Sequence, residues 1–161
     1  MKDRIKFSDE MLAAVMDGRK TQTRRIMKPQ PVLNGNFYEV FGAGWSKGIK
    51  RVTVAPGHSL ERHFPYGLVD KKIPFADKDG NIKGEIEIVD VWLQQVQEIS
   101  QEDAQAEGFE LTGWIPTYSD PDSGGEQFTP VDNFAEAWID IYGYKEWEIN
   151  PWVWAIKFKV L

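Results

Sequence analysis

The sequence has no cysteine and only two histidines, His58 and His63, among its 161 residues. The lack of cysteine excludes disulfides and thiolate metal sites. Two histidines alone do not complete a zinc site, so we predict no metal ion and no cofactor. No apolar run approaches the roughly 20 residues of a membrane helix, and no apolar stretch of a secretion signal follows the N-terminus. The sequence therefore predicts a cytoplasmic protein with no membrane partner.

An overall excess of positive charge is also lacking, because 19 Lys and Arg face 25 Asp and Glu, a net charge of −6. The distribution is uneven, however. Residues 1–72 carry 14 basic and 7 acidic side chains, and residues 73–161 carry 5 and 18. This imbalance favours one face that attracts phosphate on an otherwise acidic protein. The alternative is that the two sets of charges interleave in space.

The most informative stretch is residues 17–25, Asp-Gly-Arg-Lys-Thr-Gln-Thr-Arg-Arg. It follows a predicted short helix that begins after Ser8 as N-cap and ends at Gly18. Clustered cations repel one another, so the cluster indicates an anionic or polar ligand. We expect Arg19, Arg24 and Arg25 to contact such a ligand; the alternative is solvated surface charge.

The remaining pattern predicts an α+β fold. Alternating residues predict strands over 82–96 and 152–160, and a turn at 77–80 starts the first of them. Helices are expected after Ser100 and from Thr129 to Gly143, the second with Phe134, Trp138 and Ile141 facing the core. We predict one domain, residues 1–161, in which about six or seven strands form a small barrel or curled sheet and about three helices lie at its rim. A flap at 32–63 and a long loop at 111–129 complete the prediction.

Three segments resemble ASCH-domain proteins, and most closely the small members found in phages and prophages. They are Gly18–Arg24 (Gly-Arg-Lys-Thr-Gln-Thr-Arg), Ile99–Gly108 (with Ala-Glu-Gly at its end) and Trp138–Phe158 (with Asn-Pro-Trp-Val-Trp). The resemblance covers roughly residues 5–31 and 64–161. It implies a PUA-like β-barrel with a cleft suited to RNA or nucleotide-like ligands, and a phage or prophage origin.

One bacterial branch of this family removes the acetyl group of N4-acetylcytidine with a Lys, a Thr and a Glu. The resemblance places these roles on Lys20 as base, Thr23 as nucleophile and Glu107 as acid–base partner. The chain differs from phage-type relatives at 68–75, where Leu-Val-Asp-Lys-Lys-Ile-Pro-Phe replaces Gly-Asp-x-Leu-Trp-Val-Arg-Glu. The loop at 111–129 has no counterpart in the small hydrolase branch.

The chemistry makes demands on the local structure. A lysine with the ordinary pKa of about 10.4 is neutral in only about one molecule in 2,500 at pH 7, so the pKa must fall by about 3 for Lys20 to act as a base. Nearby arginines favour this, and an ionised Glu107 opposes it. Lys20 and Thr23 point to opposite faces of a straight strand, so a bend after Gly18 is required. Backbone N–H groups near Gly18 are candidates for binding the oxyanion.

Three functions remain open from the sequence. The first is binding of RNA or a modified nucleotide by a basic cleft around Lys20–Arg25, with bases stacked on Trp45, Trp114 or Tyr118. The second is amide hydrolysis at an N4-acylated cytosine. The third is a phage accessory protein that binds a host protein. Against these stand structural roles: a phosphate contact or helix cap for the lysine, a strand position for the threonine, an ion pair for the glutamate, and packing beneath the loops for the aromatic rings. The oligomeric state is not predicted.

Overall fold

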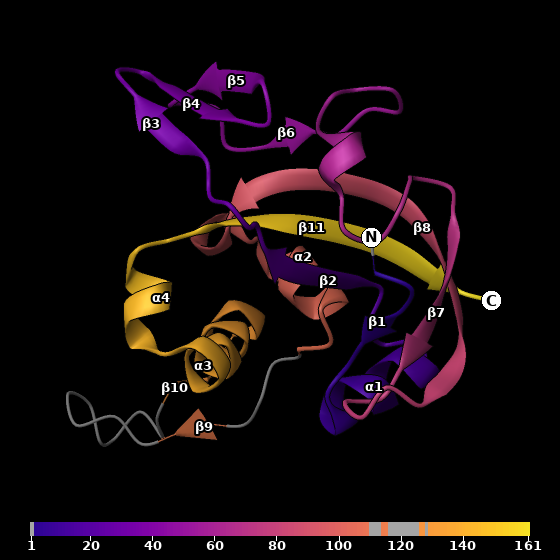
Figure 1. The fold of residues 1–161 in the computed structure, drawn as a ribbon. Helices are drawn as coiled ribbons and strands as arrows, with labels where there is room; N and C mark the ends of the chain where they lie inside the picture. Colours follow the sequence, from indigo (N-terminus) through magenta and orange to yellow (C-terminus); the bar gives the residue numbers. More distant parts are fainter. Residues whose placement is uncertain (1, 110–113, 116–125, 128) are drawn as a thin grey trace.

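The computed structural model describes residues 2–109, 114–115, 126–127 and 129–161, and it has an α+β fold built on a curled, mixed sheet that forms a half-barrel (Figure 1). Five of its six strands run in the order β1-β7-β8-β11-β2, and β6 pairs with β8 beyond the end of β7. Their bounds are β1 Ile5–Lys6, β2 Gln22–Ile26, β6 Val52–Thr53, β7 Lys72–Ala76, β8 Ile82–Gln95 and β11 Trp152–Val160. The sheet is open between its edge strands β1 and β2, and this opening positions the candidate site.

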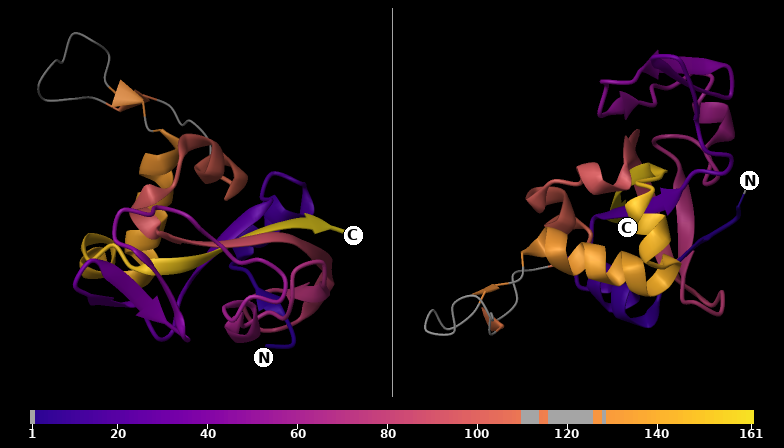
Figure 2. Two further views of the ribbon diagram at one scale, coloured as in Figure 1. Left: turned by 90° about the horizontal axis from the view of Figure 1, so that it is seen from above. Right: turned by 90° about the vertical axis from the view of Figure 1, so that its left-hand side faces the viewer.

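Smaller elements lie on both sides of the curled sheet. A three-stranded antiparallel sheet of β3 (Val32–Asn34), β4 (Phe37–Val40) and β5 (Ala43–Ser46) lies on one side, near the 3-10 turn η1 (Glu61–His63). Helices α2 (Gln101–Ala106), α3 (Pro130–Tyr142) and α4 (Tyr144–Glu148) lie on the other side (Figures 1 and 2). Helix α1 (Asp9–Met16) follows β1, and its Val15 packs in the same apolar cluster as Trp45 of β5. A second 3-10 turn, η2 (Val96–Glu98), precedes α2, and β9 (Trp114–Ile115) pairs with β10 (Glu126–Gln127).

Polar caps fix where the helices begin, as the sequence predicts. The Ser8 hydroxyl accepts the backbone N–H of Met11, and the Ser100 hydroxyl accepts that of Asp103. Thr129 and Asp132 form a reciprocal capping box at the start of α3. Each of these bonds satisfies an N–H group that has no partner within its own helix.

Two clusters of apolar side chains hold the fold together. The larger one fills the concave face of the half-barrel, where Trp152, Trp154, Ile156 and Phe158 alternate along β11. The smaller one joins the opposite face, through Val153, to helices α2 and α3. β11 lies between β8 and β2 and has both faces buried from Trp152 to Ile156. It is therefore a central strand over that stretch rather than the half-buried strand that its alternation indicates.

Two expectations need correction. The sequence predicts about three helices, but the described residues contain a fourth, α4. It follows α3 directly because the chain turns at Gly143, which has a φ of 94°. Ile141 does not face the core; it is 69% exposed near the end of α3. The helix extends beyond the cluster that buries Phe134 and Trp138, so periodicity alone overestimates its buried stripe.

Candidate functional site

The residues after Gly18 turn sharply and then enter the edge strand β2. Gly18 has φ of 83°, a conformation that other residues rarely adopt, and the Lys20 N–H bonds back to the carbonyl of Ala14. Lys20 therefore lies in the turn before β2 and does not follow the alternation of the strand. Within β2, Thr23 pairs with Ile156 and Arg25 pairs with Trp154, so both lie on the concave face. The bend that the chemistry requires is present.

The side chains of Lys20, Thr23 and Glu107 line one pocket of about 140 Å³. Its walls are largely apolar. They come from the residues just after β1, from helices α1 and α3, and from the segment that follows α2, and they include Phe7, Phe109, Phe134 and Trp138. The three polar residues are each only 3–4% exposed. Residues separated by more than 80 positions in the sequence thus converge, as the resemblance implies.

Burial changes the chemistry of Lys20. Its Nζ donates a hydrogen bond to the Glu107 carbonyl at 2.9 Å and lies 3.7 Å from Glu107 Oε2. Removal of the amine from water lowers its pKa to about 8; the Glu107 carboxylate opposes this fall, and Arg25 and Arg24 reinforce it. At a pKa of 8, about one Lys20 in ten is neutral at pH 7. The amine is therefore much closer to working as a base than an exposed lysine.

Arg24 belongs to a buried network on the other face of β2. Its guanidinium donates to Gln94 Oε1 at 2.6 Å and 3.1 Å and to Gln22 Oε1 at 3.0 Å. It also lies 3.3 Å from an Asp103 oxygen and 3.6 Å from Glu107 Oε2. Burial lowers the pKa of Arg24, while Glu107 and Asp103 oppose that fall. These partners fix Arg24 within the structure and leave it poorly placed to contact a ligand.

Arg25 lies at the opening of the half-barrel. Its Nε donates to Thr23 Oγ1 at 3.3 Å, and its Nη2 donates to the backbone carbonyl of Lys6 at 2.8 Å. The guanidinium carbon also lies 5.3 Å from the centroid of the Phe7 ring, whose residue lines the pocket. One side chain thus connects the hydroxyl of the pocket to the strand across the opening.

Arg19 lies elsewhere. Its Nε donates to the Asp17 carboxylate at 2.9 Å, and it shares a shallow hollow with Glu10, Glu136 and Asp140. These carboxylates repel an anionic ligand. The compact basic cluster expected over residues 19–25 is therefore divided into an exposed part beside acidic groups, a buried network and a part at the opening.

The backbone N–H groups near Gly18 do not form the expected oxyanion site. All four from Gly18 to Thr21 already donate to protein oxygens, namely to Val15 O, Asp17 Oδ1, Ala14 O and Ala106 O. The turn uses these groups to hold itself against α1 and α2. Positive charge beside the Thr23 hydroxyl comes instead from Arg25, whose Nε donates a hydrogen bond to Thr23 Oγ1.

Of the three aromatic residues expected to stack on bases, only Trp45 has a described side chain, and it does not line this pocket. Trp45 is 6% exposed, with its ring packed against Tyr38 and edge-on to Trp152. Tyr118 lies outside the described residues, and of Trp114 only the backbone, in β9, is described. The segment 32–63, where a flap is expected, contains the small sheet that carries Trp45; whether the segment moves stays a prediction.

The sequence analysis missed several residues of this region. Lys2 and Lys6 lie beside Arg25 at the opening, and Asp103 and Gln94 hold Arg24. Nothing in their sequence positions indicates these partners, which come from distant strands and helices. Within the described residues there is no group of three or more metal-ligating side chains, and no helix there is long and apolar enough to cross a membrane.

Comparisons with known proteins give similarities of structure only. No family model and no curated protein matches the sequence. A crystal structure of a protein from Enterococcus faecalis V583, of the family DUF984, matches all of this chain and 80% of its own, with a TM-score of 0.52 and 15% identity. An ASCH domain from Lactobacillus crispatus JV V101 matches 98% of this chain and 79% of its own, with a TM-score of 0.49 and 15% identity. The first of these similarities shows a shared fold; it carries no function with it.

Proposed function

We propose that this chain is an ASCH-type amidohydrolase that removes the acyl group from an N4-acylated cytosine. The observation that carries the proposal is the convergence of Lys20, Thr23 and Glu107 on a single pocket. Aromatic walls suit a flat base, and a volume of about 140 Å³ is well below the 300–1,000 Å³ of most small-molecule sites. Only the base with its acyl group enters, so the sugar stays outside.

Thr23 is the nucleophile in this proposal. Its Oγ1 bonds to the acyl carbon while its proton passes to the neutral amine of Lys20. Arg25, which donates to the same Oγ1 at 3.3 Å, stabilises negative charge there and leaves the hydroxyl proton free to be given away. The attack produces a tetrahedral oxyanion on the former carbonyl.

Lys20 then returns the proton to the leaving group. The bond between the acyl carbon and N4 breaks, N4 takes the proton from the Lys20 ammonium, and cytosine leaves as the free amine. The acyl group remains as an ester on Thr23. Water activated by Lys20 next attacks this ester, which releases the carboxylic acid and restores the hydroxyl. Glu107 holds the lysine amine through the 2.9 Å carbonyl contact and the 3.7 Å carboxylate contact.

The test is incubation with N4-acetylcytidine, followed by ultraviolet absorbance. Thr23→Val is expected to reduce kcat by about 1,000-fold or more, because the nucleophile is lost. Lys20→Met is expected to cost about 100- to 10,000-fold, the usual range for a general base. Thr21→Val is the matched control, since Thr21 is exposed two positions away and is expected to keep full activity.

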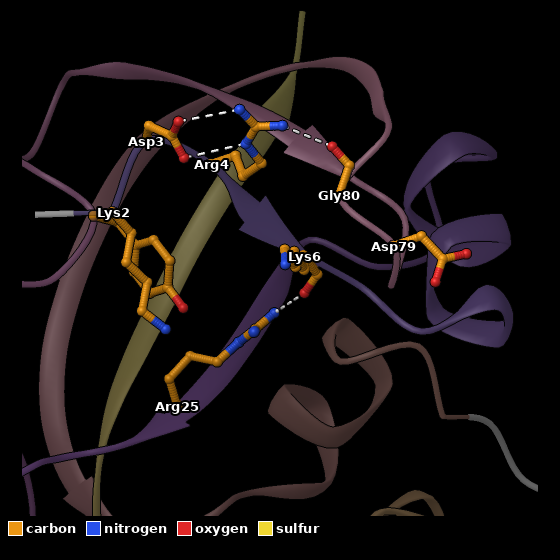
Figure 3. Close-up of a pocket in the computed structure, with 8 residues that line it drawn as sticks. Lys2, Asp3, Arg4, Lys6, Arg25, Asp79 and Gly80 are labelled. Atoms are coloured by element: carbon orange, nitrogen blue, oxygen red, sulfur yellow. Dashed lines mark hydrogen bonds and ion pairs between the residues drawn. The ribbon is translucent and has the colours of Figure 1, made fainter.

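An acetyl group on the peptide that contains Thr23, detected by mass spectrometry after rapid quenching, would support the covalent ester. No turnover by the folded protein, or full turnover by Thr23→Val, would contradict the proposal. A second function, binding of a nucleic acid or nucleotide without turnover, is favoured by Lys2 and Lys6, which line a hollow with Arg25 (Figure 3) and form no ion pair within the described residues. Binding of cytidine derivatives with no product formed would indicate this second function.

A further inference from the structure

The Glu107 carboxylate lies between two buried cations. Its Oε2 is 3.7 Å from Nζ of Lys20 in the pocket and 3.6 Å from Nη1 of Arg24, which does not line the pocket. Both separations are longer than a hydrogen bond, and this buried oxygen accepts no hydrogen bond from the described part of the chain. The carboxylate oxygen is therefore held by charge, and both cations act on it.

Arg24 is fixed by partners that the proposed reaction does not use. Four of its five N–H groups donate hydrogen bonds, to Gln94, Gln22 and Asp103, at 2.6–3.3 Å. Gln22 Nε2 also donates to the other Asp103 oxygen at 3.1 Å, which closes a ring of polar groups around the guanidinium. These contacts define one position for the guanidinium, and in that position its Nη1 faces Glu107.

The ring places a permanent charge behind a group that titrates. The Arg24 side chain is 0% exposed, and a guanidinium keeps its proton at neutral pH. Burial of an ion pair often adds nothing to stability when it is compared with apolar side chains of the same size. The stability of the fold is therefore a weak reason for this arginine, and its effect on the neighbouring carboxylate is a stronger one.

The charge state of Lys20 depends on how strongly the Glu107 carboxylate attracts a proton to the amine. Burial lowers the pKa of Lys20, the carboxylate raises it, and Arg25 and Arg24 lower it further. Arg24 acts in two ways that have the same sign. It offsets part of the carboxylate charge that Lys20 experiences, and it repels a second positive charge on the amine itself.

Two further charged groups act on Arg24 and so indirectly on the amine. An Asp103 oxygen lies 3.3 Å from Arg24 Nη2 and compensates part of the guanidinium charge. Arg51, whose guanidinium carbon lies 3.9 Å from the centroid of the Trp92 ring, repels Arg24 more weakly. Removal of the Asp103 charge should therefore have the opposite effect on Lys20 to removal of the Arg24 charge.

We propose that Arg24 is a positioning residue for the Lys20 base: it binds the Glu107 carboxylate from the side away from the pocket, so that Glu107 orients the amine without keeping it protonated. Asp103 sets how much of the guanidinium charge acts on Glu107. This inference rests on the proposed function for the role of Lys20 as base. The electrostatic coupling does not depend on hydrolysis, so the two ideas can fail separately.

The test follows the titration of Lys20 by NMR of protein labelled with ¹³C in its lysines, with the Lys20 signal assigned by its absence from Lys20→Met. Arg24→Met is expected to raise the midpoint by about one pH unit or more, the usual effect of one close charge. Hydrolysis by this variant should be about tenfold slower than wild type at pH 7 and recover by pH 10. Arg62→Met makes the same change at an exposed arginine and should titrate like wild type.

Asp103→Asn is the second variant, and it keeps the test decisive if Arg24→Met does not fold. The Asp103 side chain is 25% exposed, and asparagine retains the shape and an acceptor oxygen for the ring. The guanidinium charge then loses its compensation, so the Lys20 midpoint should lie below that of wild type. Asp79→Asn, at an exposed aspartate, is the matched control.

Shifts of opposite sign in the two variants would support the proposal, because a purely structural role gives no reason for opposite signs. An unchanged midpoint in Asp103→Asn, or shifts of the same sign in both variants, would overturn it. Opposite shifts without turnover of N4-acetylcytidine would support the coupling and reject hydrolysis. Turnover with unchanged midpoints would support hydrolysis and reject the role of Arg24.

Discussion

The cost of burying the Lys20 amine can be measured as a pH-dependent stability. Burial lowers its pKa from 10.5 to about 8, and the side chain is 3% exposed, so solvent screening is slight. Between these two pH values the unfolded chain holds a proton that the folded protein does not. The free energy of unfolding therefore rises as the pH rises from about 8 to 10.5. This added stability is lost as the pH falls back from 10.5 to 8. The full difference corresponds to about 3 kcal/mol.

The perturbation is Lys20→Met, which keeps a long side chain and removes the titrating group. Unfolding of wild type and variant in urea is measured at pH 7 and at pH 10. The difference in free energy of unfolding between the two proteins is expected to move by about 2.5 kcal/mol in favour of wild type from pH 7 to pH 10, because the unfolded lysine has not fully lost its proton at pH 10. The loss of a partner for Glu107 shifts the variant equally at both pH values and cancels. Lys47→Met, which removes an exposed lysine, should follow wild type at both.

A difference that stays constant from pH 7 to pH 10 would refute the reasoning, because it would mean that Lys20 titrates as an ordinary lysine. The same titration governs the proposed reaction. The rate of acyl hydrolysis by wild type should rise with pH and level off near pH 8, as the amine becomes neutral. A rate that keeps rising in proportion to hydroxide up to pH 10 would assign the base to another group.

Three further variants probe the surroundings of the site and the fold. Glu107→Gln removes the carboxylate between two buried cations and is expected to cost about 3–5 kcal/mol in urea unfolding; a loss below 1 kcal/mol would show that water already screens them. Gly84→Ala places a Cβ 2.6 Å from Cε1 of Phe75 and should cost about 1–3 kcal/mol, whereas Gly48→Ala, with no atom within 4 Å, should change stability little. Thr129→Ala removes the cap of α3 and should lower the thermal midpoint through a loss of about 1 kcal/mol; an unchanged midpoint would contradict that role.

Much of the secondary structure follows from short-range physics, and for that reason the sequence predicts it. A hydroxyl before a helix and a glycine after it satisfy local backbone groups, so the starts of α1, α2 and α3 are foreseeable. The turn before β8 is likewise set by neighbours, because the Asp77 carboxylate accepts the N–H groups of Asp79 and Asn81. The order of strands in the sheet depends on pairings between distant segments and does not follow from such rules.

The charges of residues 19–25 show where prediction from the sequence ends. Alternation along β2 already implies that Arg24 and Arg25 lie on opposite faces, and a stricter use of that period would have separated them. The partners that decide their roles could not be foreseen. Asp103 and Glu107 reach Arg24 from α2 and its end, and Lys6 reaches Arg25 across the opening.

The amino-acid sequence by itself determined which chemical groups are available: an amine, a hydroxyl and a carboxyl in segments with clear local structure, and no thiol. Only the tertiary structure decided how reactive and how accessible each group is. The reason is that desolvation and charge–charge energies depend on every atom nearby, whatever its position in the chain. Helices packed from distant segments took water away from Lys20, while the gap between the two edge strands left Lys2, Lys6 and Arg25 facing solvent.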